Sequence, residues 1–261
     1  MLYLKVILLP ASGHKRSIDD LYHLMQKICM RVWKRRHTVS NWTFLSKLGE
    51  GSHSSVWLVR KGSSPRFFAA KQYTAKCYAE RERRVLRQVS SPHVMTLVAT
   101  CDHGAYISIL PLLSPLPPSM SSVQFERLCS HSAQVLCTVI RFTDFFFHLS
   151  ACQGLAALHL QGFIHHDIKP DNILYNEDAN TFVVSDFTLA TDSDEVCYAH
   201  PTHRYVAPET DVMCSFAEDV WSLGTVLLES APESCSLSTR QVLRKMTNAD
   251  PTARPTADEV C

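Results

Sequence analysis

The stretch Ile164–Leu174, IHHDIKPDNIL, decides the fold and raises the first question about function. It places Asp167, Lys169 and Asn172 close together, between apolar residues that are typical of strand ends. One hypothesis for a carboxylate, an ammonium group and an amide at this spacing is the transfer of a phosphoryl group. If that interpretation holds, the rest of the chain must supply a glycine-rich cradle for phosphates and a second, metal-binding aspartate.

The composition is that of a globular protein with a packed core. The chain has 261 residues, 46% of them hydrophobic, and a formal net charge of +1, which does not indicate nucleic acid as a partner. No apolar run approaches the roughly 18 residues of a membrane span. The 10 cysteines are scattered without a Cys-x-x-Cys pair, so we expect reduced thiols in an intracellular protein, cytoplasmic or nuclear. The sequence carries no signal for an oligomeric state.

The first half of the chain has two regions with different residue patterns. Residues 1–40 form an extension in which Ser17–Arg36 has the apolar spacing of a helix. From Trp42 onward, β-like runs alternate with Gly, Ser, Pro and Asp, which predicts a small antiparallel sheet within residues 41–114. One helix, at residues 76–89, interrupts the strands. The predicted strands lie at residues 42–51, 55–62, 67–73, 94–101 and 105–113.

The second half, residues 115–261, is predicted to be mainly helical. The Pro- and Ser-rich segment Ser114–Ser122 marks the boundary between the two halves. The segment Thr138–Ala151 is interpreted as inserted material, because the sequences on its two sides would join into one helix without it. Helical spacing of apolar residues is found at residues 145–162, 219–230 and 239–246.

Two candidate phosphate-binding elements lie in the first half. The turn Leu48–Val56, LGEGSHSSV, contains Gly49 and Gly51, which would let backbone amides approach phosphate oxygens without a Cβ in the way. Lys71 ends the apolar run FFAAK, where an ammonium group is costly to bury unless it meets phosphates and a carboxylate. Glu82, on the following helix, could be that carboxylate.

The second half supplies candidate metal ligands and a candidate base. Asp186 ends the apolar run before it and places a carboxylate where a hard cation such as magnesium could bind. Asn172 offers a neutral oxygen for a second ion. Asp167 could accept a proton from an attacking hydroxyl or orient it, and Lys169 could balance charge on the transferred phosphoryl group.

From Trp42 to its C-terminus the sequence resembles the eukaryotic-type protein kinases. The resemblance rests on several motifs in the expected order: the glycine-rich turn, FAAK, HHDIKPDN, SDF, YVAPE, DVWSLG and DPTARPT. Lys169, two residues after Asp167, resembles the serine/threonine-specific group. The resemblance implies an α+β fold with an antiparallel-sheet N-lobe containing one helix and a larger, mainly helical C-lobe. It further implies ATP and Mg²⁺ as cofactors and Ser or Thr of proteins as acceptors.

The resemblance also implies a role for each matching residue. Lys71 would hold the α- and β-phosphates and would pair with Glu82. Magnesium would be held by Asp186 and Asn172, and Asp167 would be the catalytic base. Thr202 would help to seat the substrate hydroxyl. The adenine and phosphate pocket would be formed by Leu48, Gly49, Glu50, Gly51, Val56, Ala69 and Leu174. Two structural roles follow as well: an ion pair between Glu209 and Arg254, and a brace from Asp219 to the backbone of the catalytic loop.

Three residues depart from the family pattern. His166 replaces the arginine that normally receives a phosphorylated activation loop, so we predict activity that does not depend on that phosphorylation. Thr188 replaces the glycine after Asp-Phe, and its β-branched side chain is expected to restrict rearrangement of Phe187. Ser54 replaces the third glycine of the phosphate loop. The shortened C-terminal region adds to this divergence, which resembles that of virus-encoded kinases.

Two alternatives to a protein kinase remain open from the sequence. A pseudokinase would use the same fold as a scaffold or allosteric partner with weak or no nucleotide binding, but Lys71, Asp167 and Asp186 are all present. A kinase that acts on a small molecule would not need the peptide-binding platform that YVAPE and Thr202 indicate. An active protein kinase is therefore the favoured interpretation.

Overall fold

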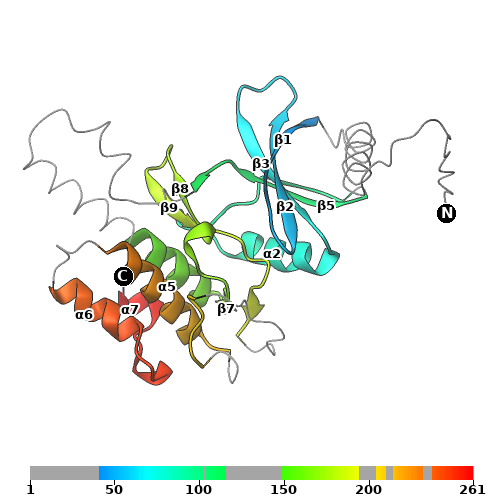
Figure 1. Ribbon diagram of the computed structural model, residues 1–261. Helices are drawn as coiled ribbons and strands as arrows, with labels where there is room; N and C mark the ends of the chain where they lie inside the picture. The colour runs from blue at the N-terminus through cyan, green and yellow to red at the C-terminus, as the bar shows by residue number, and fades with distance from the viewer. Residues whose placement is uncertain are drawn as a thin grey trace, which may run out of the picture.

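The computed structural model describes residues 41–102, 104–115, 149–193, 204–209, 214–231 and 237–260. The predicted helical extension at residues 1–40, most of the segment interpreted as inserted, and Thr202 lie outside these residues. Figure 1 shows an antiparallel sheet with one helix beside it, and a second group of elements in which helices predominate. We call the first group the N-lobe and the second group, including all described residues from 149 onward, the C-lobe.

The N-lobe sheet has five strands in the order β1-β2-β3-β5-β4, all antiparallel to their neighbours. Its core packs Trp42 and Trp57 against small and branched apolar residues of the central strands. The predicted β-like runs are confirmed, except that the fourth strand is much shorter than predicted. The strands are β1 (Trp42–Glu50), β2 (Ser54–Lys61), β3 (Phe67–Tyr73), β4 (Ala99–Cys101) and β5 (Tyr106–Pro111).

One helix of the N-lobe, α2 (Lys76–Gln88), lies beside the sheet, where the periodicity predicts it. Its apolar face buries Val85 and Leu86, and these residues join the core of the C-lobe. The opposite face carries charged side chains, as the amphipathic pattern predicts. Because α2 packs on both lobes, its position decides where Glu82 lies.

The C-lobe combines small sheets with helices. Strands β6 (Ser114–Pro115), β8 (Ile173–Asn176) and β9 (Thr181–Val184) form one sheet, and β7 (Phe163–Ile164) pairs with β10 (Thr191–Asp192) in another. The 3-10 turn η1 (Pro170–Asn172) leads into β8. The helical segments are residues 149–160, α5 (Phe216–Ser230), α6 (Leu237–Met246), the 3-10 turn η2 (Pro251–Ala253) and α7 (Ala257–Val260).

Two glycines allow helices of the C-lobe to lie so close to neighbouring segments that no side chain fits between them. A Cβ added at Gly154, in the helix at residues 149–160, would lie 2.5 Å from the carbonyl oxygen of His93 and 2.8 Å from Val184 Cγ2. A Cβ added at Gly224 in α5 would lie 2.7 Å from Cβ of Met246 in α6. Real Cβ atoms do not approach this closely, so both contacts require glycine.

Candidate active site

Lys71 and Glu82 form a buried ion pair between the N-lobe sheet and α2. Nζ of Lys71 lies 2.6 Å from Oε2 of Glu82, and the two side chains are 5% and 0% exposed. Burial alone would lower the pKa of Lys71, but the charges of Glu82 and Asp186 outweigh it and raise that pKa above its usual value. Burial raises the pKa of Glu82, and the ammonium group of Lys71 opposes that shift. The predicted pairing of these two residues is therefore present.

Asp186 reaches the same ammonium group from the C-lobe. It follows β9, and its Oδ1 lies 2.7 Å from Nζ of Lys71. Burial alone would raise the pKa of Asp186, but Lys71 and a hydrogen bond from Thr188 hold it well below its usual range, so the carboxylate stays charged. Its φ of 64° lies in the left-handed region, which aspartate tolerates better than most residues. Lys71 thus joins side chains from both lobes at one point.

Asp167, Lys169 and Asn172 form a second polar group in the loop between β7 and β8. Nζ of Lys169 lies 2.7 Å from Oδ2 of Asp167. The Nδ2 group of Asn172 donates to the backbone carbonyl of Asp167 at 2.8 Å and to its Oδ2 at 2.9 Å. Asp167 is 7% exposed and Asn172 is 5% exposed. Lys169 and Asn172 are therefore both in direct contact with Asp167.

Asp219, in α5, fixes the backbone just before Asp167. Its two oxygens accept hydrogen bonds from the backbone N–H groups of His165 at 2.7 Å and His166 at 2.9 Å, and Nε2 of His159 lies 2.9 Å away. Burial would raise the pKa of Asp219, but the contact with His159 outweighs it and lowers that pKa. These bonds hold His166 at a φ of 65°, a conformation that otherwise costs about 1–3 kcal/mol. The predicted brace is confirmed.

We expect Asp219→Asn to destabilise the fold. The amide offers one acceptor where the carboxylate serves two buried backbone donors, so one N–H loses its partner at a cost of about 1–3 kcal/mol. Urea unfolding of the two proteins measures this difference. Asp258→Asn, an exposed substitution in α7, is the matched control and should leave the midpoint unchanged. An unaltered midpoint for Asp219→Asn would show that Asp219 does not support the loop.

His166 occupies the position where the family has arginine, and it is bound within the protein. Its Nε2 lies 2.7 Å from Oγ1 of Thr191, and its Nδ1 lies 3.3 Å from Oε2 of Glu218. His165 is fully buried, with its ring centroid 5.2 Å from that of Phe187. Both histidines therefore hold the loop to its surroundings.

The cysteine prediction holds only in part. Cys77, Cys101 and Cys152 are free thiols, two of them buried. Cys214 is disulfide-bonded, and its partner lies outside the described residues. The scattered spacing gave no sign of this bond, because spacing alone does not show which cysteines approach each other in the fold.

The residues predicted to hold nucleotide and magnesium lie on β1 to β3 of the N-lobe and on the C-lobe segment from η1 to Asp186. Within the described part of the chain, no hydrogen bond reaches Oδ2 of Asp186 or Oδ1 of Asn172, so both oxygens remain for a hard cation. Gly49 lies at the end of β1, and a Cβ added there would meet nothing within 4 Å. The other predicted contacts are Leu48 and Glu50 in the last part of β1, Gly51 just after it, Val56 in β2, Ala69 in β3 and Leu174 in β8.

The order of these elements and their contacts match a known family. The family model of the protein kinase domain matches residues 42–233. The chain belongs to the protein kinase family. Its two-lobed α+β architecture, with a sheet-rich N-lobe and a mainly helical C-lobe, is the fold that the sequence predicts.

Curated relatives of this kinase include serine/threonine kinases. It is 31% identical over 254 residues to a membrane-associated tyrosine- and threonine-specific cdc2-inhibitory kinase of Drosophila melanogaster. It is 28% identical over 203 residues to a calcium/calmodulin-dependent protein kinase type 1 of Caenorhabditis elegans, and 31% identical over 223 residues to the serine/threonine-protein kinase Kist of Mus musculus. These matches cover 83%, 70% and 72% of this kinase and 45%, 53% and 51% of the relatives. The chain therefore spans about half the length of these relatives.

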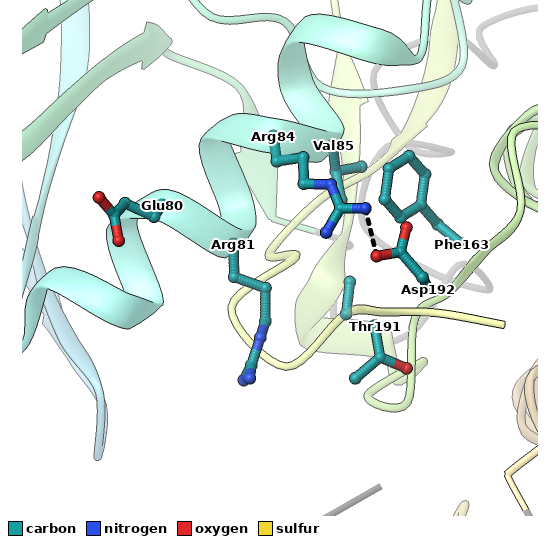
Figure 2. A pocket seen from close by; sticks show the side chains of 8 residues that line it. Glu80, Arg81, Arg84, Val85, Phe163, Thr191 and Asp192 are labelled. Atoms are coloured by element: carbon teal, nitrogen blue, oxygen red, sulfur yellow. Dashed lines mark ion pairs between the residues drawn. The ribbon is translucent and has the colours of Figure 1, made fainter. Parts of the chain in front are cut away.

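A contact between α2 and β10 of the kinase was not found from the sequence. The guanidinium of Arg84 pairs with the carboxylate of Asp192 and stacks over the ring of Phe163, 5.5 Å from its centroid. Arg84 and Asp192 line a cavity of about 190 Å³. Figure 2 shows that the side chain of Arg81, which also lines this cavity, points away from the Arg84–Asp192 pair. The pair ties the helix that carries Glu82 to the C-lobe. The only sequence signal was the charged face of α2, which does not identify a distant partner.

The predicted ion pair between Glu209 and Arg254 of the kinase is confirmed. One guanidinium nitrogen donates to Oε2 of Glu209 at 2.8 Å, and the other contacts Oε1. The Arg254 side chain is 0% exposed and also donates to backbone carbonyls of Ala217 and Asn248. This pair anchors the segment after the activation loop to the end of the C-lobe.

None of the described helices of the kinase is long and apolar enough to cross a membrane.

Proposed function

We propose that this kinase transfers the γ-phosphate of ATP to serine or threonine side chains of proteins. The observation that carries the proposal is the meeting of Lys71, Glu82 and Asp186, at 2.6 and 2.7 Å, beside the loop that holds Asp167. Burying an ammonium group with two carboxylates costs desolvation free energy, and such buried charge clusters are typical of sites that bind a charged ligand. A nucleotide triphosphate is the ligand that the family binds.

Each side chain has a role that its surroundings support. Lys71, held by Glu82, is positioned to bind phosphate oxygens of the nucleotide. Asp167 would orient the acceptor hydroxyl and take its proton. Lys169, whose Nζ contacts Asp167, would balance charge on the transferred phosphoryl group. Catalysis would then consist mainly of positioning and charge neutralisation. Thr202 is assigned to the acceptor site on the sequence motif alone.

Mg²⁺ is the metal that the donor set fits. Asp186 and Asn172 both offer oxygen atoms, which are the ligands that this hard cation prefers. When bound, the metal would neutralise charge on the nucleotide phosphates. The low pKa of Asp186 supports this role, because the carboxylate is ionised at neutral pH and ready to bind a cation.

The proposed acceptor residues and cellular location are supported by the sequence and by the similarity to known kinases. Lys169, two residues after Asp167, supports serine and threonine as acceptors, and one of the relatives above, Kist, is named as a serine/threonine-protein kinase. One relative is named as specific for tyrosine and threonine, so tyrosine belongs among the acceptors to be tested. We also predict that the substrates are proteins, that nucleic acid is not a partner, and that the kinase is intracellular, in the cytoplasm or the nucleus.

The test is transfer of labelled γ-phosphate from ATP to a degenerate peptide array with Ser, Thr or Tyr as the acceptor. Lys71→Met protein serves as the blank. We expect labelling of Ser and Thr peptides above the blank. Labelling of Tyr peptides alone would contradict the acceptor class. Binding of nucleotide without any transfer would instead support the pseudokinase alternative.

A further inference from the structure

Thr188 lies at the centre of the active-site ion cluster. The residue is 4% exposed, and it stands where the family has glycine. Its hydroxyl oxygen lies 2.9 Å from Nζ of Lys71 and 3.2 Å from Oε2 of Glu82, and it makes a short contact with Oδ1 of Asp186. A glycine could make none of these three side-chain contacts.

The hydrogen-bonding capacity of these groups defines what the hydroxyl does. An ammonium group has three N–H donors, and the donors of Lys71 have Glu82, Asp186 and Thr188 within reach. A threonine hydroxyl accepts from Lys71 and has a single proton to donate, either to Asp186 or to Glu82. It therefore links the helix α2, the strand β3 and the segment after β9 through one atom.

Local structure keeps this hydroxyl in place. A β-branched side chain has few χ1 rotamers, so its oxygen is fixed with the backbone. The backbone N–H of Thr188 also donates to Oδ1 of Asp186 at 3.3 Å, and the preceding Phe187 is fully buried. The positive φ in this segment falls at Asp186, so Thr188 is not strained by its branched side chain.

We propose that the Thr188 hydroxyl is a positioning group that holds Lys71, Glu82 and Asp186 in the catalytic arrangement. This inference rests on the proposed kinase function and adds a regulatory consequence to it. The Thr188 side chain would thus stabilise the Lys71–Glu82–Asp186 cluster from within the site, without a regulatory modification. The kinase then keeps α2 and Asp186 aligned without a phosphorylated activation loop, for which His166 offers no guanidinium.

Three substitutions separate the hydroxyl from the shape of the side chain. Thr188→Val keeps the branched shape and removes the hydroxyl, Thr188→Ser keeps the hydroxyl, and Thr188→Gly removes both. A hydrogen bond to a charged group corresponds to about tenfold or more in rate. We therefore expect kcat to fall about tenfold or more for Val and Gly, with a higher Mg²⁺ requirement, and to stay near wild type for Ser. Thr225→Val removes a hydroxyl from α5 and is the matched control, with no change expected.

A second measurement does not depend on activity. Hydrogen–deuterium exchange of peptides from residues 76–88 and 184–190 should be faster in Thr188→Val than in wild type, and restored in Thr188→Ser. If wild-type protein transfers no phosphate, the proposed function fails, but this exchange pattern would still support the positioning role. Exchange and kinetics in Thr188→Val equal to wild type would overturn the inference. Equal impairment of Val and Ser would also overturn it, because the shape and not the hydroxyl would then matter.

Discussion

Asp167→Asn should reduce the rate of phosphoryl transfer about 100-fold to 10,000-fold, the range expected for loss of a general base. The amide has nearly the same size as the carboxylate, and it can keep a contact with Asn172. It cannot accept the proton of the acceptor hydroxyl, and Lys169 loses its charged partner at 2.7 Å. The effect should appear in kcat, with nucleotide affinity unchanged. Initial rates of labelled phosphate transfer over a range of ATP concentrations measure both quantities.

Asp171→Asn is the control for this substitution. Asp171 lies in the same loop, but its side chain is exposed. The control should transfer phosphate at nearly the wild-type rate. If Asp167→Asn were as active as Asp171→Asn, Asp167 would not be the catalytic base.

Lys71→Met should abolish measurable transfer and also destabilise the fold. Glu82 has no exposed side-chain surface, and removal of its cationic partner leaves a buried carboxylate without compensation. Breaking a buried pair in this way costs about 3–5 kcal/mol. Part of that cost is avoided if Glu82 becomes protonated, as its raised pKa favours. Urea unfolding monitored by circular dichroism measures the loss.

The double substitution Lys71→Met with Glu82→Met tests the reason for the loss. Removing both charges leaves no unpaired ion, so the double variant should be more stable than Lys71→Met alone. It should remain inactive, because no ammonium group is left to bind phosphates. A double variant that is no more stable than the single one would contradict the assigned ion pair.

The spacing of apolar residues predicted which helices and strands form better than it predicted the residues at which they begin and end. The period of apolar residues located β1 to β3, β5 and α2, because each buries a face whose spacing is visible in the sequence. The fourth strand is short because Val94 forms a parallel bridge with Val184 of β9 and so leaves the N-lobe sheet. Helix α5 begins at Phe216, three residues before the predicted start, because Ser215 and Glu218 form a capping box. The bridge depends on a contact between distant residues, whereas the capping box is a local signal that the spacing of apolar residues does not contain.

The sequence predicted which residues meet at the candidate active site, but not all of the contacts between them. The order of motifs identified Lys71, Glu82 and Asp186, and the structure brings them together. Thr188 was noted for its shape, whereas its hydroxyl contacts depend on the approach of α2 and β9. The pair between Arg84 and Asp192 was missed for the same reason. The roles in catalysis and cofactor binding stay predictions until they are measured.

The most direct test of the account is the affinity of the kinase for a non-hydrolysable ATP analogue, measured by calorimetry with and without Mg²⁺. If Lys71 and Asp186 serve one nucleotide–metal pocket, Mg²⁺ should raise the affinity of the wild-type protein about tenfold or more. The same addition should have little effect on Asp186→Asn. An affinity that is the same in both proteins and independent of Mg²⁺ would contradict the account.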